Sequence, residues 1–118
     1  MLKVLSDSGK QVILVMQAPL PETHIRSHVR KSVVGYNSSV YGRTLEDWNK
    51  IYAAKSQLLK ELPLSVSVLD PSEKFCKDSR CLVVKNGHAL YFDDDHISVD
   101  GARFLSGEVL KMLKISKN

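Results

Sequence analysis

The stretch that best indicates the fold and the chemistry of this chain reads Leu90-Tyr91-Phe92-Asp93-Asp94-Asp95-His96-Ile97-Ser98-Val99-Asp100-Gly101-Ala102. A carboxylate three residues before a histidine can hold one imidazole nitrogen across a turn, which leaves the other nitrogen free to act as a base toward a nucleophile. This spacing favours Asp93 as the partner of His96. Asp95 adjoins the histidine, so its side chain should diverge from the ring, and Asp94 fits the turn less well. The alternative is a solvated acidic loop with one surface histidine, because three successive Asp residues match many spacings.

The residues on either side of this block predict a hairpin before it and a helix after it. Asn86-Gly87 separates two short apolar runs, and both residues tolerate the positive φ of a tight hairpin turn. Ser98 precedes a helical apolar pattern, so its hydroxyl is expected to cap that helix. The positive end of the helix dipole would then disfavour a protonated His96, and we expect this histidine to be neutral and able to act as a base.

The upstream sequence alternates between strand and helix patterns. The expected elements are a helix tail at 2–8, an apolar strand buried on both faces at 11–17, a helix at 22–34, a helix capped by Thr44 and running to Leu62, and a short strand at 65–69. Because this order favours parallel strands joined by right-handed crossovers, the predicted fold class is α/β.

Cys76 and Cys81 flank a polar, loop-like spacer and form the disulfide candidate of the chain. So short a loop would stabilise the fold by less than the roughly 3 kcal/mol expected for a fifteen-residue loop, and the bond would imply an oxidising compartment. A zinc site that uses both cysteines and His88 is the alternative, although such sites usually have a second pair of closely spaced ligands. Free thiols are the third possibility.

Composition excludes several classes of protein. The chain has 118 residues, of which 43% are apolar and 25% charged, as in a single globular domain without disordered composition. Its longest apolar run is far short of the roughly 18 to 20 residues that span a bilayer, and the N-terminus lacks the pattern of a signal peptide.

The positive charge of the chain is mild and mostly dispersed. A net charge of +4 without grouped aromatic residues does not indicate a nucleic-acid surface. The exception is His24-Ile25-Arg26-Ser27-His28-Val29-Arg30-Lys31, which could bind an anionic glycan or phosphate. The four-residue recurrence of Ile25, Val29 and Val33 instead favours an ordinary solvated helix face, with the basic residues outside the apolar stripe.

The block from Tyr91 to Ser98, followed by Gly101-Ala102, closely resembles the last conserved block of SGNH hydrolases, in the version fused to membrane acyltransferases of the acyltransferase 3 type. The strand end Gln17-Ala18-Pro19, the turn Leu69-Asp70-Pro71 and the two cysteines fit the same pattern, so the resemblance extends from about Lys10 onward. It implies that Asp93 and His96 supply two members of a catalytic triad whose third member is a serine.

The family's nucleophilic serine lies in a Gly-Asp-Ser motif after the first strand of the domain, and this motif is not in the sequence. The oxyanion-hole glycine and asparagine also belong to blocks that are not present. Ser8, in Asp7-Ser8, precedes a strand rather than following one, so it is not the expected nucleophile. The resemblance therefore implies that residues 1–118 are a partial SGNH-type domain: the C-terminal half of a flavodoxin-like three-layer α/β/α sandwich, with a short β-hairpin before the final helix.

The function implied by the resemblance is the transfer or removal of acyl groups, with acetyl expected, on hydroxyls of surface polysaccharides. No cofactor, metal or nucleic acid is expected. The expected partners are an acyl donor, a glycan acceptor, the upstream half of the SGNH domain and a transmembrane acyltransferase domain, at the periplasmic or extracellular face of the membrane. Tyr36, Asn37 and Arg43 are candidate substrate contacts. The alternative is a non-catalytic α/β module without activity of its own.

Overall fold

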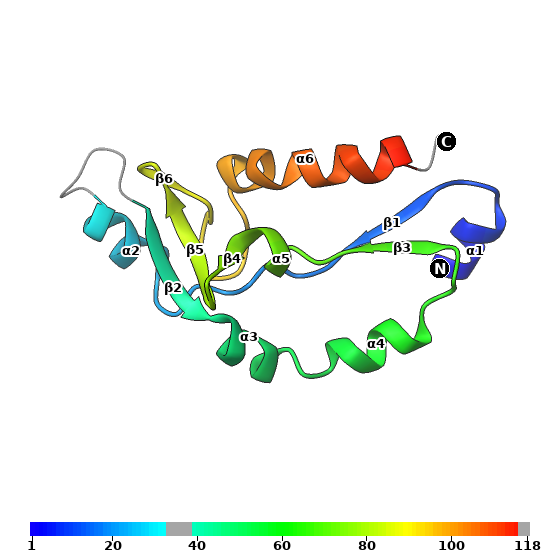
Figure 1. Ribbon diagram of the computed structural model, residues 1–118, viewed down its shortest axis with the longest axis horizontal. Coiled ribbons are helices and arrows are strands. Elements are labelled where there is room, and N and C mark those ends of the chain that lie inside the picture. Colours follow the sequence, from blue (N-terminus) through cyan, green and yellow to red (C-terminus); the bar gives the residue numbers. More distant parts are fainter. Residues whose placement is uncertain (33–38, 116–118) are drawn as a thin grey trace.

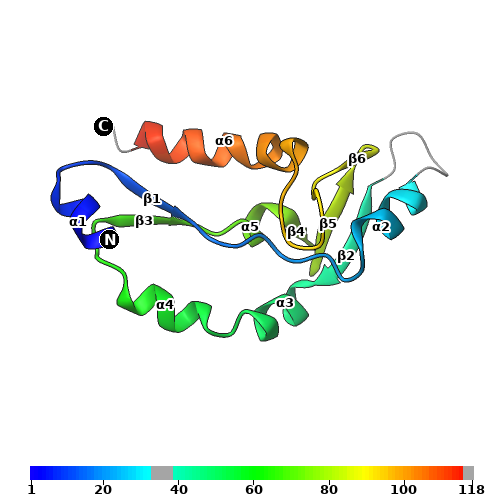
Figure 2. The same ribbon diagram turned by 180° about the vertical axis from the view of Figure 1, so that it is seen from behind.

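The computed structural model describes residues 1–32 and 39–115 and shows a mixed α/β chain. Its elements are α1 (Leu2–Asp7), β1 (Val12–Val15), α2 (Ile25–Ser32), β2 (Val40–Thr44), α3 (Leu45–Ile51), α4 (Lys55–Glu61), β3 (Val66–Leu69), α5 (Ser72–Phe75), β4 (Cys76–Lys77), β5 (Arg80–Lys85), β6 (His88–Ala89) and α6 (Val99–Ile115). Figure 1 shows α6 on one side of the β1–β3 ribbon and α3 with α4 on the other, and the view from behind in Figure 2 agrees. The elements therefore form three layers.

β1 and β3 pair in parallel, as the alternating pattern predicted, with Val12 opposite Val66 and Val15 opposite Leu69. The hydrogen bond from Met16 N to Leu69 O continues the ladder by one residue at 2.9 Å. The expectation that this strand is buried on both faces is wrong for the structure as described, because β1 is half-buried and Val15 is 45% exposed. Within the described residues β1 has a neighbouring strand on only one edge, which leaves its other edge uncovered.

The second sheet is antiparallel, in the order β2-β5-β4 with β6 also paired to β5. The predicted hairpin is confirmed, and Asn86 and Gly87 have φ of 50° and 81°. A second tight turn at Asp78 and Ser79, with φ of 52° and 69°, joins β4 to β5. Two-residue turns of this kind force antiparallel pairing. The sequence predicted this pairing for the hairpin but did not predict that β2 and β4 also pair with β5. Strand β2 was missed because its sequence resembles a polar loop.

The helices differ from their predicted bounds at turns and caps. Thr44 caps α3, as predicted, by accepting a hydrogen bond from Asp47 N at 3.1 Å. The single helix predicted from Thr44 to Leu62 is instead two helices, because Tyr52 leaves the helical conformation and stacks on Trp48 at 5.2 Å between ring centroids. The helix predicted at 22–34 begins at Ile25, and its predicted end lies outside the described residues.

The core lies at the end of the molecule that carries the hairpin. Phe75 is 1% exposed and makes edge contacts with Tyr91 and Phe104, and Val84 and Leu90 pack in the same cluster. By contrast, α1 and α4 bury no residue. The radius of gyration is 15.9 Å, whereas a compact domain of this length has about 13.5 Å. The hairpin and the start of α6 are therefore the firmly packed part of the chain, and they carry the acidic loop between them.

Candidate active site

The loop from Phe92 to His96 is closed by backbone hydrogen bonds at its base. Phe92 N donates to His96 O at 2.8 Å, and Tyr91 forms an isolated antiparallel bridge with Ile97. Ser98 holds the exit of the loop, since its backbone N donates to Leu90 O at 2.9 Å and its Oγ donates to Ala89 O at 2.6 Å. The same Oγ accepts from Gly101 N at 3.0 Å, so the predicted helix cap is confirmed. These contacts attach the loop rigidly to the hairpin and to α6.

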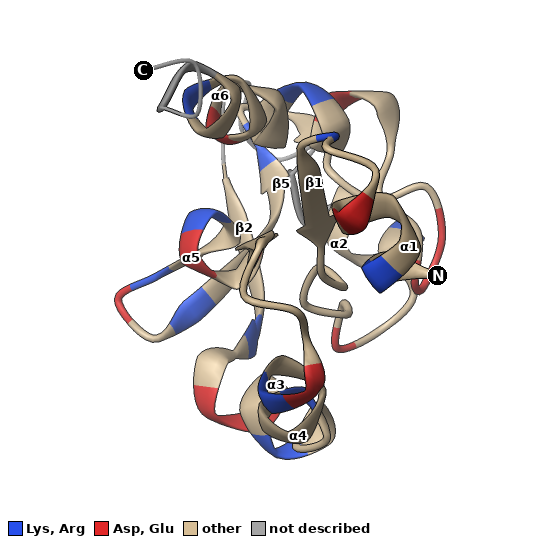
Figure 3. Ribbon diagram, turned by 90° about the vertical axis from the view of Figure 1, so that its right-hand side faces the viewer, with Lys and Arg blue, Asp and Glu red and all other residues tan. Residues whose placement is uncertain are grey.

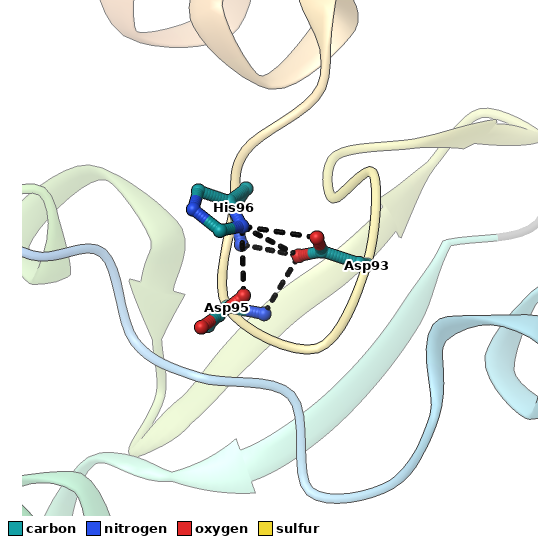
Figure 4. Close-up of side chains that lie close together, drawn as sticks. All are labelled: Asp93, Asp95 and His96. Atoms are coloured by element: carbon teal, nitrogen blue, oxygen red, sulfur yellow. Dashed lines mark hydrogen bonds and ion pairs between the residues drawn. The ribbon is translucent and has the colours of Figure 1, made fainter.

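Asp93 and His96 meet across this turn, as Figure 4 shows. The Nδ1 of His96 lies 3.0 Å from Oδ1 and 2.9 Å from Oδ2 of Asp93. Oδ1 also accepts backbone hydrogen bonds from Asp95 N at 3.0 Å and His96 N at 2.7 Å. The carboxylate is therefore oriented by the backbone before it contacts the ring. Because Nδ1 must carry the proton that it donates, the neutral ring presents Nε2 as its acceptor.

Asp95 also reaches the ring, contrary to the expectation that its side chain diverges. Its Oδ1 lies 2.7 Å from His96 Nδ1. One N–H cannot bond fully to two carboxylates, so Asp93 and Asp95 compete for it. Asp93 is 40% exposed and held by two backbone donors, whereas Asp95 is 62% exposed and its carboxylate has no backbone donor among the described residues. Asp93 is accordingly the better-ordered partner.

The charges of the loop favour the protonated histidine. Backbone hydrogen bonds from Asp95 and His96, together with the histidine side chain, lower the pKa of Asp93 far below its usual range. The hydrogen bond and charge of Asp93, followed by the charge of Asp95, raise the pKa of His96 above its ordinary value of 6.5. The helix dipole was expected to lower the pKa of His96, but the shift has the opposite direction, because two carboxylates in direct contact outweigh a dipole that begins three residues later.

Gln17 is a site residue that sequence reasoning missed. Its Nε2 donates to the backbone oxygen of Asp95 at 2.9 Å and so ties the loop to the end of β1. A cavity of about 190 Å³ lies at this junction; it is lined by Val15, Met16, Gln17, Ala18, Pro71, Asp95, His96, Ile97 and Leu105. The available signal was the position of Gln17 at the carboxyl end of a parallel strand, where α/β proteins place their ligands.

Other predicted residues have different surroundings. Ser8 ends α1 and donates to Leu5 O at 2.6 Å, at the opposite end of β1 from the loop (Figure 1). Arg43 donates to the backbone oxygens of Leu20 at 3.0 Å and Pro21 at 3.3 Å, so its guanidinium holds two chain segments together. Tyr36 and Asn37 lie outside the described residues.

Cys76 and Cys81 form a disulfide across the paired strands β4 and β5. The bonded sulfurs are not the thiolates that the alternative zinc site would need. Asp93, Asp95 and His96 offer ligand atoms within 4.8 Å of one another, but their mutual hydrogen bonds already account for this cluster.

The comparisons with known proteins identify the family of this chain. The family model described as the SGNH domain fused to AT3 domains matches residues 1–111. No curated protein and no solved structure matches the chain. Because the match covers nearly the whole sequence, including the loop that joins Asp93 to His96, the chain belongs to the family of SGNH domains that are fused to AT3 domains.

Proposed function

We propose that this chain supplies the histidine base and the orienting carboxylate of a Ser-His-Asp triad in an O-acyltransferase or esterase. Membership in the family already indicates a role related to acyl transfer or hydrolysis. The observation that supports the finer assignment is the contact of His96 Nδ1 with Asp93 at 2.9 Å, while no described residue occupies Nε2. A ring held in this way has the tautomer that a general base requires.

In this proposal the nucleophilic serine comes from another part of the complete protein. His96 Nε2 takes the proton of the serine hydroxyl as the serine oxygen attacks the acyl carbonyl, and the donor's leaving group departs with a proton returned from the ring. A sugar hydroxyl or water then attacks the acyl-serine through the same proton exchange. Asp93 stabilises the imidazolium at each step, which agrees with the raised pKa of His96.

We propose that the acyl group is acetyl and that the acceptors are hydroxyls of surface polysaccharides. The AT3 domain of the complete protein would deliver the acyl group from the membrane to the periplasmic or extracellular face. The disulfide between Cys76 and Cys81 supports an oxidising compartment. Among the residues that the structure describes, no helix is long and apolar enough to cross a membrane.

The test compares two histidines of the complete protein that have similar exposure. His96→Ala should abolish acetylation of the polysaccharide in cells, read from the acetyl signals of the purified polymer by NMR. His88→Ala is the matched control, because His88 is 70% exposed, against 72% for His96, and also faces a carboxylate, at 3.6 Å from Asp100. It should leave acetylation unchanged.

Asp93→Asn should reduce acetylation strongly by removing the orienting charge, whereas Ser8→Ala should have no effect. Full acetylation by the His96→Ala protein, at equal expression, would refute the catalytic assignment and favour a non-catalytic module. The isolated chain should not hydrolyse p-nitrophenyl acetate above a His96→Ala control. The reason is that its sequence lacks the Gly-Asp-Ser motif and the oxyanion-hole blocks, and a single oxyanion-hole donor alone is worth roughly 100- to 1000-fold in rate.

A further inference from the structure

A second concave surface lies beside the acidic loop, on the face formed by α2 and the end of the hairpin. It is an open, shallow hollow of about 390 Å³, lined by Ile25, Arg26, Val29, Ala89, Tyr91 and Phe92. That volume is at the lower end of the range for small-ligand sites, which are mostly apolar with a few well-placed polar groups. Phe92 belongs to both features, because its backbone closes the base of the loop and its side chain lines this pocket.

The floor of the pocket is rigid and its rim is available to a ligand. Ile25 and Tyr91 are 5% and 2% exposed, and the hydroxyl of Tyr91 donates to Pro19 O, so neither side chain is free to move. Phe92, in contrast, is 77% exposed, although the preceding Tyr91 is buried. A flat aromatic face at the edge of an apolar hollow suits the apolar face of a sugar ring.

Arg26 places a positive charge at the rim of this pocket, which favours a negatively charged ligand. Its side chain is exposed, and no described residue forms an ion pair with its guanidinium. The carboxylate of Asp94 faces His24, with 3.7 Å between its Oδ1 and His24 Nε2. An unpaired guanidinium at the rim of an apolar pocket is arranged to receive a carboxylate or another planar oxyanion.

We infer that this pocket, referred to as the Phe92 pocket, binds an acidic sugar residue of the acceptor polysaccharide, with the ring against Phe92 and its carboxylate on Arg26. The inference rests on the proposed function for the identity of the substrate as a glycan. The Phe92 pocket is lined by the start of the acidic loop, and the cavity at His96 is lined by the end of the same loop. A polysaccharide bound in the pocket would be held there while a neighbouring sugar of the same polymer reaches His96.

The test measures binding to the 118-residue chain directly, without acyl transfer, by isothermal titration calorimetry with trigalacturonic acid. The neutral methyl ester of the same trisaccharide is the matched ligand. Trigalacturonic acid should bind, and the ester should bind more weakly. Phe92→Ala should weaken binding of the acid about tenfold, through lost apolar contact, and Arg26→Gln about fivefold, through lost charge. Arg103→Gln is the control, because Arg103 is also exposed but lies on α6, is paired with Asp100 and does not line the pocket.

The controls separate this inference from the proposed function. His96→Ala should bind trigalacturonic acid as the unaltered chain does, so a failure of catalysis would leave the binding result intact. Absence of binding, or equal binding by the Phe92→Ala and Arg26→Gln chains, would overturn the assignment of the pocket. Equal binding of acid and ester would overturn the acidic sugar. Conversion of a dimer to a monomer by Phe92→Ala in sedimentation would show a contact between copies and would also overturn it.

Discussion

Gly101→Ala should destabilise the chain although alanine is the better helix former. A Cβ on Gly101 would lie 2.1 Å from the backbone oxygen of Leu90 and 3.1 Å from the Cβ of Ile97. An ordinary carbon–oxygen contact is at least about 3.2 Å, so the start of α6 and the end of the hairpin must separate by roughly 1 Å. That movement would stretch the hydrogen bonds that Ser98 makes to the carbonyls of Ala89 and Leu90.

The magnitude follows from these contacts. Weakening two hydrogen bonds costs about 1 to 3 kcal/mol, and strain in a packed region costs about 1 to 3 kcal/mol. The helical preference of alanine offsets about 1 kcal/mol. We therefore expect the free energy of unfolding to fall by about 1 to 5 kcal/mol. Gly107→Ala, in the same helix, is the matched control. Nothing lies within 4 Å of its added Cβ, so it should raise the free energy of unfolding by about 0.5 to 1 kcal/mol.

Urea denaturation followed by circular dichroism measures both variants. The ring signals of His96 in NMR spectra provide a second readout, since Gly101→Ala should shift them and Gly107→Ala should not. If Gly101→Ala proves as stable as Gly107→Ala, the close approach of α6 to Leu90 is not present in solution. The account of how the loop is positioned would then be wrong.

Further predictions concern charge, the disulfide and local stability. Asp93→Asn should lower the pKa of His96 further than Asp95→Asn does, by removing its main partner, and NMR titration of the ring should show this order. Because the pKa of Asp93 is lowered and that of His96 is raised, the pair should stabilise the loop fully between about pH 4 and pH 6.5. This stabilisation should be lost as acid protonates Asp93 and as alkali deprotonates His96. Protection factors of the loop amides against hydrogen exchange that are the same at pH 3, pH 6 and pH 9 would contradict this prediction. Replacing both cysteines by serine should lower the free energy of unfolding by less than about 3 kcal/mol, because the loop is short; a larger loss in urea would contradict a purely local role. Hydrogen exchange of the backbone amides should be fast in α1 and α4, which bury no residue, and slowest in β5. Equal protection of all helices and strands would contradict this prediction, because it would show that the chain unfolds as a single cooperative unit.

Sequence patterns predicted those elements whose signals are local. Asn86-Gly87 has the residue types of a two-residue hairpin turn, and Thr44 and Ser98 carry the hydroxyls that cap helices, so each element appears where it was expected. The contact of Asp93 with His96 belongs to the same class, because a three-residue spacing in a tight turn brings the two side chains together almost independently of the rest of the fold. The family, too, was recognisable from this block, as the match to residues 1–111 shows.

Features that depend on distant neighbours could not be predicted in this way. The strand at 40–44 exists because it pairs with β5, about 40 residues further along the chain, and its own sequence resembles a loop. The break in the predicted helix after Ile51 depends on the position of Tyr52 against Trp48. Burial of the first strand was overestimated because periodicity reports only that a segment is apolar, whereas its exposure depends on which elements cover it.

By itself the sequence determined the turns, the caps, the family and the pairing of Asp93 with His96, since backbone preferences and short spacings act within a few residues. Only the tertiary structure decided that Gln17 holds the loop from the end of β1 and that Arg43 donates to the backbone oxygens of Leu20 and Pro21. It also brought Arg26 to the same pocket as Phe92. Contacts between residues this far apart in the sequence depend on how strands and helices pack. The spacing of residues along the chain does not show which distant segments will lie together.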